Sequence, residues 1–392
     1  MVAVASASAA TEAQELRAMY QLDRNITFLN HGSFGATPEP VFEVYQAWQR
    51  ELEREPVAFV QRRQEKLLNA ARSQIATWLN VGSRDISFVV NATSGLNVIA
   101  RSLPLEPGDE ILTTDLEYGA LDFTWDHLCR KAGASYIHQP IRLPVTTKGA
   151  VVEALWEGVT ERTRAIFLSH ITSATALILP VEEICARARA EGILTIIDGA
   201  HAPGQLVLDL TELGADIYAG NFHKWLCTPK GTAFLYVRPD QQEWVESLTI
   251  SWGWRPGHTF VSRNQQQGTR DVSGFLAVPR AIEFQREHDW SGVRQRCFTM
   301  LVRLRQDLHE RWGTTPLSPD SPDWYRQLAT FTLPASAPED LQERLFMNHA
   351  IDVPVTGHLD QRFVRVSVQG YTNDEDLDRL RHALDIELAT GD

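Results

Sequence analysis

Two short segments of the sequence place a charged side chain directly after an apolar run that is typical of a buried strand. One runs from Ile196 to His201 and contains Asp198, and the other runs from Gly220 to Trp225 and contains Lys224. A buried Asp at a strand end is costly without a cationic partner, although a helix cap or a turn is the ordinary alternative. Apolar and aromatic neighbours would lower the pKa of Lys224 and leave a neutral amine suited to covalent chemistry with a carbonyl group. A solvated surface lysine is the alternative for Lys224.

A third segment, Val90–Asn97, follows a predicted strand and opens a predicted helix. Small residues with free backbone N–H groups at a helix N-terminus form an anion site, although Thr and Ser are also ordinary helix caps. No glycine-rich loop of the Walker type accompanies the segment, which favours a single phosphate over a nucleotide. Together the three segments predict one ligand with a phosphate, a ring nitrogen that needs a carboxylate, and an aldehyde that needs a lysine.

The elements that position these segments alternate between short apolar runs and longer amphipathic ones. Such alternation predicts a mostly parallel sheet flanked by helices, with the ligand beyond the carboxyl ends of the strands. The predicted strands are Ile86–Val90, Glu110–Thr113, Ala165–Ser169, Leu194–Asp198, Asp216–Gly220 and Ala233–Val237. The predicted helices in and before this region are Val41–Leu52, Gln61–Leu79, Gly119–Ala132, Val151–Val159 and Val181–Glu191.

The pattern changes after Val237, where Gln241–Gly274 is rich in Trp, Gly and Gln and irregular. We therefore expect an N-terminal segment over residues 1–30, a large domain over 31–274 and a small α+β domain over 275–392. The elements predicted for the small domain are helices at Val278–His288, Gly292–Glu310, Glu339–His349 and Glu375–Leu388, and strands at Ala329–Leu333 and Phe363–Val368.

The order and spacing of the motifs resemble the PLP-dependent transferase fold, which is aspartate aminotransferase-like, in its class V aminotransferase family. The resemblance covers the chain from about Asn30 to Asn373. It implies pyridoxal 5'-phosphate (PLP) as cofactor, a small-molecule amino acid as substrate, and a homodimer with the active site at the interface.

Carried over residue by residue, the resemblance assigns Lys224 as the Schiff-base lysine and Asp198 as the carboxylate that keeps the pyridine nitrogen protonated. That protonation lets the ring accept electrons from a substrate carbanion. His201 takes the place of a residue that contacts the ring oxygen or the lysine. The resemblance implies further cofactor contacts: Ala92, Thr93 and His223 at the phosphate, Tyr118 stacked on the ring, His170 and Thr172 at the ring hydroxyl, and Thr269 at the phosphate of the partner subunit.

Two residues are assigned to the substrate. Arg365 resembles the arginine that clamps the substrate α-carboxylate, and a structural salt bridge is the alternative. His31 lies in Phe28–Pro38, a segment that resembles the isopenicillin N epimerase subgroup. It is interpreted as a substrate contact or a second acid–base group, with a hydrogen-bonded structural histidine as the alternative.

Several reactions can follow removal of the α-proton by Lys224. Persulfide-forming desulfuration needs a cysteine in a mobile loop of the small domain, and no cysteine follows Cys297. The subgroup contains epimerases and also C–S β-lyases, such as those acting on hercynylcysteine sulfoxide or cysteine. Epimerisation or racemisation and β-elimination are the leading outcomes, transamination comes third, and a non-catalytic PLP-fold binding protein is a further alternative.

The bulk properties are those of a soluble globular protein with 43% apolar and 22% charged residues. With 37 basic and 50 acidic residues and no long basic run, a nucleic-acid or anionic-membrane partner is disfavoured. The four cysteines are widely spaced, which indicates a reducing, cytoplasmic location and predicts no metal site. No apolar run is long enough to cross a bilayer, and Met1–Ala10 is interpreted as a frayed tail.

Overall fold

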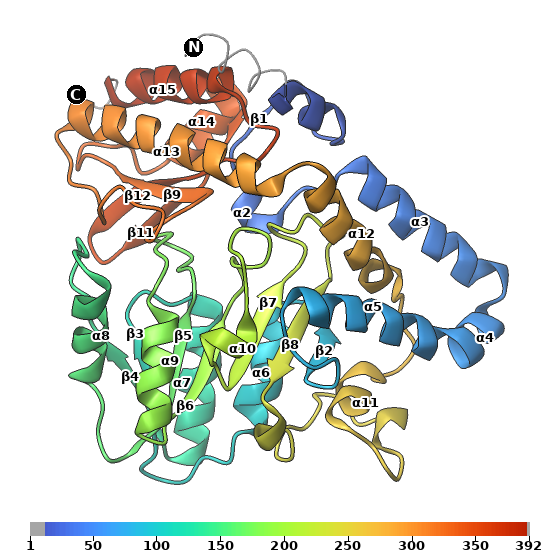
Figure 1. Ribbon diagram of the computed structural model, residues 1–392. Coiled ribbons are helices and arrows are strands. Elements are labelled where there is room, and N and C mark those ends of the chain that lie inside the picture. Colours follow the sequence, from blue (N-terminus) through green and yellow to red (C-terminus); the bar gives the residue numbers. More distant parts are fainter. Residues whose placement is uncertain (1–11, 390–392) are drawn as a thin grey trace.

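A seven-stranded sheet carries the segments that are predicted to do chemistry (Figure 1). In the computed structural model, which describes residues 12–389, the strand order is β2-β8-β7-β6-β5-β3-β4. The predicted tail over Met1–Ala10 lies outside the described residues. The strands are β2 (Ile86–Val89), β3 (Glu110–Thr114), β4 (Ser135–Gln139), β5 (Thr163–Ser169), β6 (Leu194–Asp198), β7 (Ile217–Asn221) and β8 (Ala233–Val237).

The five strands from β7 to β4 are parallel, and β8 runs antiparallel to both of its neighbours. This confirms the predicted mostly parallel sheet. The edge strand β4 was not predicted, because its side chains are exposed or half-buried and form no continuous apolar run.

Both faces of the sheet are covered, because successive side chains of a strand point to opposite faces. In β5, Ala165 and Phe167 join the core formed with α6 and α7, whereas Ile166 and Leu168 join the core of the other face. Figure 1 shows the helices in these two layers. The first layer contains α6 (Ala92–Ser102) and α7 (Gly119–Ala132), and the second contains α5 (Gln64–Trp78), α8 (Lys148–Trp156), α9 (Val181–Ala190) and α10 (Leu210–Leu213).

A smaller antiparallel sheet of order β11-β12-β9 lies at the top of Figure 1, beside three helices. Its strands are β9 (Leu328–Thr332), β11 (Val355–His358) and β12 (Gln361–Ser367), and the helices are α13 (Trp290–Trp312), α14 (Leu341–His349) and α15 (Asp374–Ala389). The N-terminal part of the chain joins this region, because β1 (Thr27–Phe28) pairs in parallel with β10 (Ile351–Asp352). The short turn α2 (His31–Phe34) follows β1.

A helical arm extends to the right of Figure 1. It contains α3 (Glu39–Arg54), α4 (Pro56–Ala58), a π-helical turn (Phe59–Arg63) and α5, against which α12 (Ser273–Glu287) packs. The sequence places a domain boundary near residue 275, whereas α12 lies against α3 and α5, and α13 follows it toward the small sheet.

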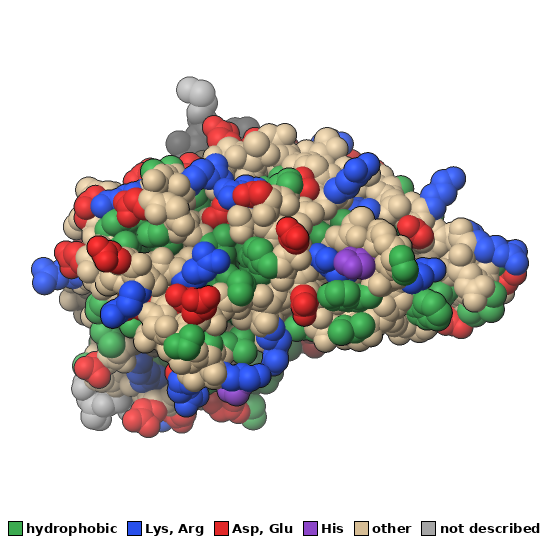
Figure 2. All heavy atoms as spheres, turned by 90° about the horizontal axis from the view of Figure 1, so that it is seen from below, with side chains coloured by type: hydrophobic (Ala, Val, Ile, Leu, Met, Phe, Trp, Pro, Cys, Tyr) green, Lys and Arg blue, Asp and Glu red, His purple; other side chains and the backbone are tan. Residues whose placement is uncertain are grey.

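The segment between β8 and α12, predicted to be irregular, contains three short helical turns, Pro239–Gln241, Trp252–Trp254 and α11 (Phe260–Gln265). Seen from below in Figure 2, acidic and basic side chains are interspersed with apolar ones. Within residues 12–389, no helix combines the length and the apolar character that a membrane crossing requires.

Candidate active site

A cavity of about 430 Å³ lies at the carboxyl edge of the large sheet. Each of three neighbouring strands contributes its last residue to the wall: Ser169 ends β5, Asp198 ends β6 and Asn221 ends β7. The N-terminal turn α2 and strand β12 close the cavity from the other side. Its lining also includes Ser33, Phe34, Val90, Asn91, Thr93, Tyr118, Ile171, Ser173, Ala200, His201, His223, Lys224, Gly231 and Arg365.

Lys224 lies three residues beyond the end of β7, and its Nζ atom is 3.1 Å from Nε2 of His201. Burial lowers the pKa of Lys224 to about 8, although the nearby carboxylate of Asp198 raises it; the positive charge of Arg365 lowers it further. A substantial fraction of the amine is therefore unprotonated near neutral pH, as nucleophilic chemistry requires.

Asp198 is only 4% exposed, and one of its oxygens accepts the N–H of Ala200 at 2.8 Å. No cationic side chain of residues 12–389 lies within ion-pair distance of it. Burial raises its pKa to about 6, while the bond from Ala200 and the charge of Lys224 lower it. A buried carboxylate that faces a cavity and has no cation within ion-pair distance among the described residues is suited to a ligand that brings an N–H⁺ group, such as a protonated pyridine nitrogen.

The N-terminus of α6 forms another part of the wall. The side chain of Asn221 accepts the Ala92 N–H at 2.8 Å, and the side chain of Asn91 accepts the Ser94 N–H at 2.7 Å. Because these amides are already paired, the amide and hydroxyl of Thr93 are the groups of this turn that a phosphate could engage. His223 lines the same cavity, and burial lowers its pKa to about 4.

Arg365 points from β12 into the cavity and is 5% exposed. Its guanidinium donates to the carbonyl oxygen of Ser173 at 2.7 Å and to Oγ of Ser33 at 2.8 Å, and its buried Nε has no hydrogen-bond partner within residues 12–389. Among the described residues it forms no salt bridge, so the structural ion pair left open by the sequence is not present. Burial lowers its pKa to about 10, which still leaves it charged. The group is suited to a ligand carboxylate.

Two residues predicted to contact the ring hydroxyl point away from this cavity. The chain after β5 alternates its side chains, so Ser169, Ile171 and Ser173 line the cavity, whereas His170 and Thr172 do not. The Thr172 hydroxyl bonds to the Thr175 hydroxyl at 2.7 Å and accepts the Leu177 N–H at 2.8 Å.

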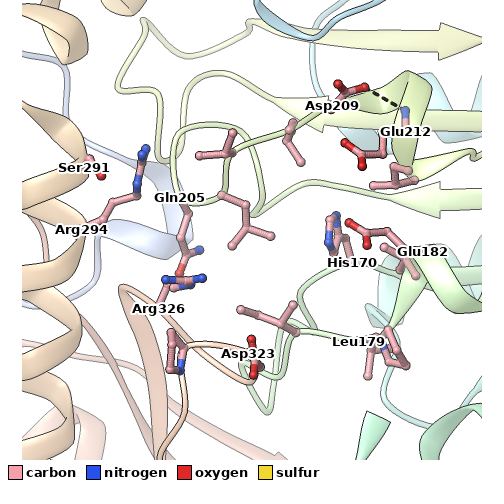
Figure 3. A pocket seen from close by; sticks show the side chains of 18 of the residues that line it. His170, Leu179, Glu182, Gln205, Asp209, Glu212, Ser291, Arg294, Asp323 and Arg326 are labelled. Atoms are coloured by element: carbon pink, nitrogen blue, oxygen red, sulfur yellow. Dashed lines mark hydrogen bonds between the residues drawn. The ribbon is translucent and has the colours of Figure 1, made fainter. Parts of the chain in front are cut away.

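His170 instead faces a second cavity of about 700 Å³ between α9, α10 and the start of α13 (Figure 3). Its Nδ1 is 2.9 Å from the hydroxyl of Tyr218, and its backbone N–H donates to the carbonyl oxygen of Asp198 at 2.8 Å. His170 therefore supports the strand end that carries Asp198 and does not line the cavity around Lys224.

His31, predicted as a substrate contact, is fully buried and does not line the cavity. Its Nε2 is 3.0 Å from the carbonyl oxygen of Lys224, and its Nδ1 is 2.9 Å from the hydroxyl of Tyr371. Burial lowers its pKa to about 3, so the ring is neutral. The structure thus places His31 behind the Lys224 backbone, in the structural role that the sequence left as the alternative.

Two predicted phosphate contacts also lie outside this lining. Ala92 is buried, and its N–H is already bonded to Asn221. Thr269 is exposed on the single chain and does not line the cavity, so its predicted contact with a partner subunit stays a prediction. The remaining predicted residues, Thr93, Tyr118, His201, His223 and Lys224 with Asp198 and Arg365, all line the cavity.

Sequence reasoning missed several residues of the site. Asn221 stands at a strand end, a signal that was used for Asp198 but not for Asn221. Glu117 is 8% exposed and accepts both the N–H and the hydroxyl of Ser169, at 2.7 and 2.6 Å. Burial raises the pKa of Glu117 to about 8, although these hydrogen bonds lower it. Ser33 and Phe34 reach the site only through the folding of the N-terminal segment onto the small sheet.

Comparisons with known proteins agree with this geometry. The family model described as aminotransferase class-V matches residues 36–380. The isopenicillin N epimerase of Amycolatopsis lactamdurans is 36% identical over 98% of this chain and 99% of its own length. The epimerase of Streptomyces clavuligerus is 35% identical over 95% and 97%. An L-cysteine desulfhydrase of Arabidopsis thaliana is 28% identical over 91% of this chain and 86% of its own.

Solved structures share the architecture. The cysteine desulfurase of Thermococcus onnurineus NA1 superposes with a TM-score of 0.81, over 96% of this chain and 98% of its own. The two sequences are 19% identical, so this likeness concerns the fold alone.

Proposed function

We infer that this chain, which belongs to the aminotransferase class-V family, binds PLP around Lys224 and acts at the α-carbon of an amino acid or a small molecule that carries one. The observation that carries the proposal is that Asp198 and Arg365, two buried charges without an ion-pair partner in the described part of the chain, line one cavity with the buried amine of Lys224. A ligand with a ring N–H⁺ and a ligand with a carboxylate would together neutralise both charges.

PLP, when bound, supplies an electron sink for the negative charge that develops at the α-carbon. Asp198 would hold the ring nitrogen in its protonated form, and the Thr93 amide and hydroxyl with His223 would hold the phosphate. Arg365 would bind the α-carboxylate and so orient the α-carbon toward the cofactor. Nζ of Lys224, as a neutral amine, would remove the α-proton and can return it.

We propose epimerisation or racemisation as the outcome. It is supported by relatives named isopenicillin N epimerase that are 35–36% identical over nearly the whole of both chains. Inversion requires that the proton return to the face of the α-carbon opposite to the one from which it was removed, and the product keeps all atoms of the substrate.

C–S β-elimination is the second candidate, supported by the likeness to an L-cysteine desulfhydrase. It begins with the same proton removal by Lys224, after which the C–S bond breaks and the sulfur leaves with the bonding electrons. Desulfuration through an enzyme persulfide is disfavoured, because all four cysteines are buried and β11 with its following loop contains none.

The test is incubation of the PLP-loaded protein with candidate amino acids in D₂O. Deuterium at the α-carbon with inverted configuration supports the epimerase, and pyruvate with a released sulfur product supports the lyase. A keto acid formed from the whole substrate indicates an aminotransferase. A protein that takes up no PLP, or whose visible absorption band survives in Lys224→Ala, would overturn the proposal.

We also propose a homodimer with the active site at the interface. The exposure of Thr269 on the single chain supports this, because the family places such a residue at the partner's phosphate site. Light scattering of the purified protein measures the assembly, and a monomer would contradict it.

A further inference from the structure

Trp225 follows Lys224 in the chain, and its indole contacts the imidazole that contacts the lysine amine. Nε1 of Trp225 is 3.3 Å from Nδ1 of His201, and Nε2 of the same imidazole is 3.1 Å from Nζ of Lys224. The indole and the imidazole are both buried. The three side chains form a short row of hydrogen bonds that ends at the reactive amine.

The chemistry of each group fixes the direction of these hydrogen bonds. An indole N–H can only donate, so Nδ1 of His201 must accept and carries no proton. His201 is neutral, because burial lowers its pKa well below its ordinary value. The ammonium form of Lys224 and the guanidinium of Arg365 act in the same direction. The single imidazole proton therefore lies on Nε2, where it faces the amine.

We propose that Trp225, by donating its indole N–H to His201, fixes the imidazole proton on Nε2 and thereby favours Lys224 as a neutral amine. An amine nitrogen accepts a hydrogen bond only when it is unprotonated. An ammonium group would face an N–H donor at 3.1 Å. The imidazole could accept from it only by carrying its proton on Nδ1, which would break the bond from Trp225. Protonating Lys224 therefore costs one buried hydrogen bond.

The other charged and titratable groups around Lys224 do not make this arrangement redundant. Burial and the charge of Arg365, on β12, lower the lysine pKa, but Asp198, at the end of β6, raises it. His223, adjacent in the chain, is neutral because burial lowers its pKa to about 4. The carboxylate of Asp198 favours the ammonium form of Lys224. The hydrogen bond from Trp225 to His201 favours the neutral amine and therefore acts against the effect of the carboxylate.

Trp225 is held in place by contacts that do not involve His201. Its carbonyl oxygen accepts the side-chain N–H of Gln285 at 2.8 Å, and its ring packs with Ala176 and Leu328. A Cβ atom at Gly204 would lie 2.4 Å from the Trp225 backbone, so the chain is also tightly fitted there. The substitution Trp225→Phe keeps an aromatic ring in this packing and removes the N–H.

The inference rests on the proposed function only for the role of Lys224 as the reactive group, and its tests need neither PLP nor turnover. The first test is the pH dependence of Lys224 acylation in the full-length chain freed of cofactor, followed by peptide mass spectrometry. The wild-type midpoint is expected near the lysine pKa of about 8. Loss of one buried hydrogen bond in Trp225→Phe should raise it by about one pH unit.

Trp125→Phe is the matched control, because Trp125 is also fully buried but its N–H has no partner among the described residues. Its midpoint should equal that of the wild type. In a His201→Gln background, Trp225→Phe should give no shift, because an amide can donate or accept in either orientation. An unchanged midpoint in folded Trp225→Phe, or an equal shift in Trp125→Phe, would overturn the proposal.

The second test reads the tautomer in the wild-type chain and needs no variant of Trp225. Two-bond nitrogen–proton NMR of ¹⁵N-histidine-labelled protein distinguishes the tautomers, and His201→Gln identifies the His201 signals. We expect the proton on Nε2; a proton on Nδ1 would refute the inference. A chain that binds no PLP yet shows the Nε2 tautomer and the acylation shift would contradict the proposed function and would leave this inference intact.

Discussion

The guanidinium of Arg365 donates a hydrogen bond to Oγ of Ser33 across 2.8 Å, although the two residues are 332 positions apart. Ser33 also donates to the side chain of Asn30, whose amide donates to Asp352 at 3.0 Å. Neutral groups thus orient the guanidinium from both sides, and its charge remains available to a ligand. The N-terminal turn and the small sheet together make this wall of the cavity.

Arg365→Lys should raise KM for the amino-acid substrate by about 10- to 100-fold, because the ammonium keeps the charge but loses the planar fork that pairs with a carboxylate. The visible band of bound PLP should be unchanged. Arg362→Lys is the control: Arg362 lies on the same strand, and its guanidinium donates to backbone carbonyls at residues 337–339. Steady-state kinetics measures both, and equal effects in the two variants would rule out a special role for Arg365.

Asp198→Asn should stabilise the cofactor-free chain at neutral pH. Burial raises the Asp198 pKa from 3.8 to about 6, so the folded chain binds this proton more tightly than the unfolded chain does. The resulting stability is complete below the unfolded pKa and is lost as pH rises through about 6. The difference, 6 − 3.8 = 2.2 units, corresponds to at most about 3 kcal/mol. An Asn side chain cannot ionise, so the variant does not lose this stability as the pH rises.

Urea unfolding of both proteins measures this difference in the free energy of unfolding. The gain in the free energy of unfolding of Asp198→Asn should be largest at about pH 8 and small at about pH 4. A gain that does not depend on pH would mean that the charge of Asp198 is not its cause. The same variant should lose PLP-dependent turnover, because an amide cannot keep the ring nitrogen protonated.

Gly35→Ala should disturb the lysine segment directly. Gly35 has φ +69°, and a Cβ atom there would lie 2.1 Å from the carbonyl oxygen of His223 and 2.8 Å from that of Lys224. Gly257→Ala is the matched control, since Gly257 has φ +82° and a Cβ atom there would have no described residue other than its chain neighbours within 4 Å. Both should lose about 1–2 kcal/mol from backbone strain. Only Gly35→Ala should weaken PLP binding, measured by absorbance titration; equal binding in the two variants would contradict this.

Alkylation of the native protein should leave activity unchanged. Cys129, Cys185, Cys227 and Cys297 are all buried, and burial raises their pKa values to about 11, 12, 12 and 12. Few thiolates are therefore accessible to iodoacetamide near neutral pH. Mass spectrometry counts the labelled sites, with the urea-unfolded chain as the positive control. Rapid labelling of one cysteine with loss of activity would instead indicate a catalytic thiol.

The sequence was sufficient for most of the sheet and for placing Asp198 and Lys224 at the same edge of it, because each lies at or just beyond the end of a continuous apolar strand and parallel strands end at one edge. It was not sufficient to place His170 and Thr172. The side chains after β5 alternate between the cavity and the opposite side, and a shift of one residue would exchange the two sets. The structure shows that Ile171 and Ser173 have the inward phase.

Contacts between distant segments were the other limit. The role of His31 depends on Tyr371, and the setting of Arg365 depends on Ser33, partners more than 300 positions away. A buried histidine with both ring nitrogens bonded has the same local sequence as a substrate contact. Only the folded chain shows that His31 lies behind the Lys224 backbone.

The pairing of β1 with β10 also sets a condition on biosynthesis. Thr27 and Phe28 are made more than 300 residues before Ile351 and Asp352. Domains generally fold as the chain emerges, so the sheet that carries Lys224 can form while β1 still lacks its partner. The turn that follows β1 and holds Ser33 against Arg365 must wait until β10 and β12 have been made. A nascent chain can therefore contain Lys224 and yet lack the contact between Ser33 and Arg365.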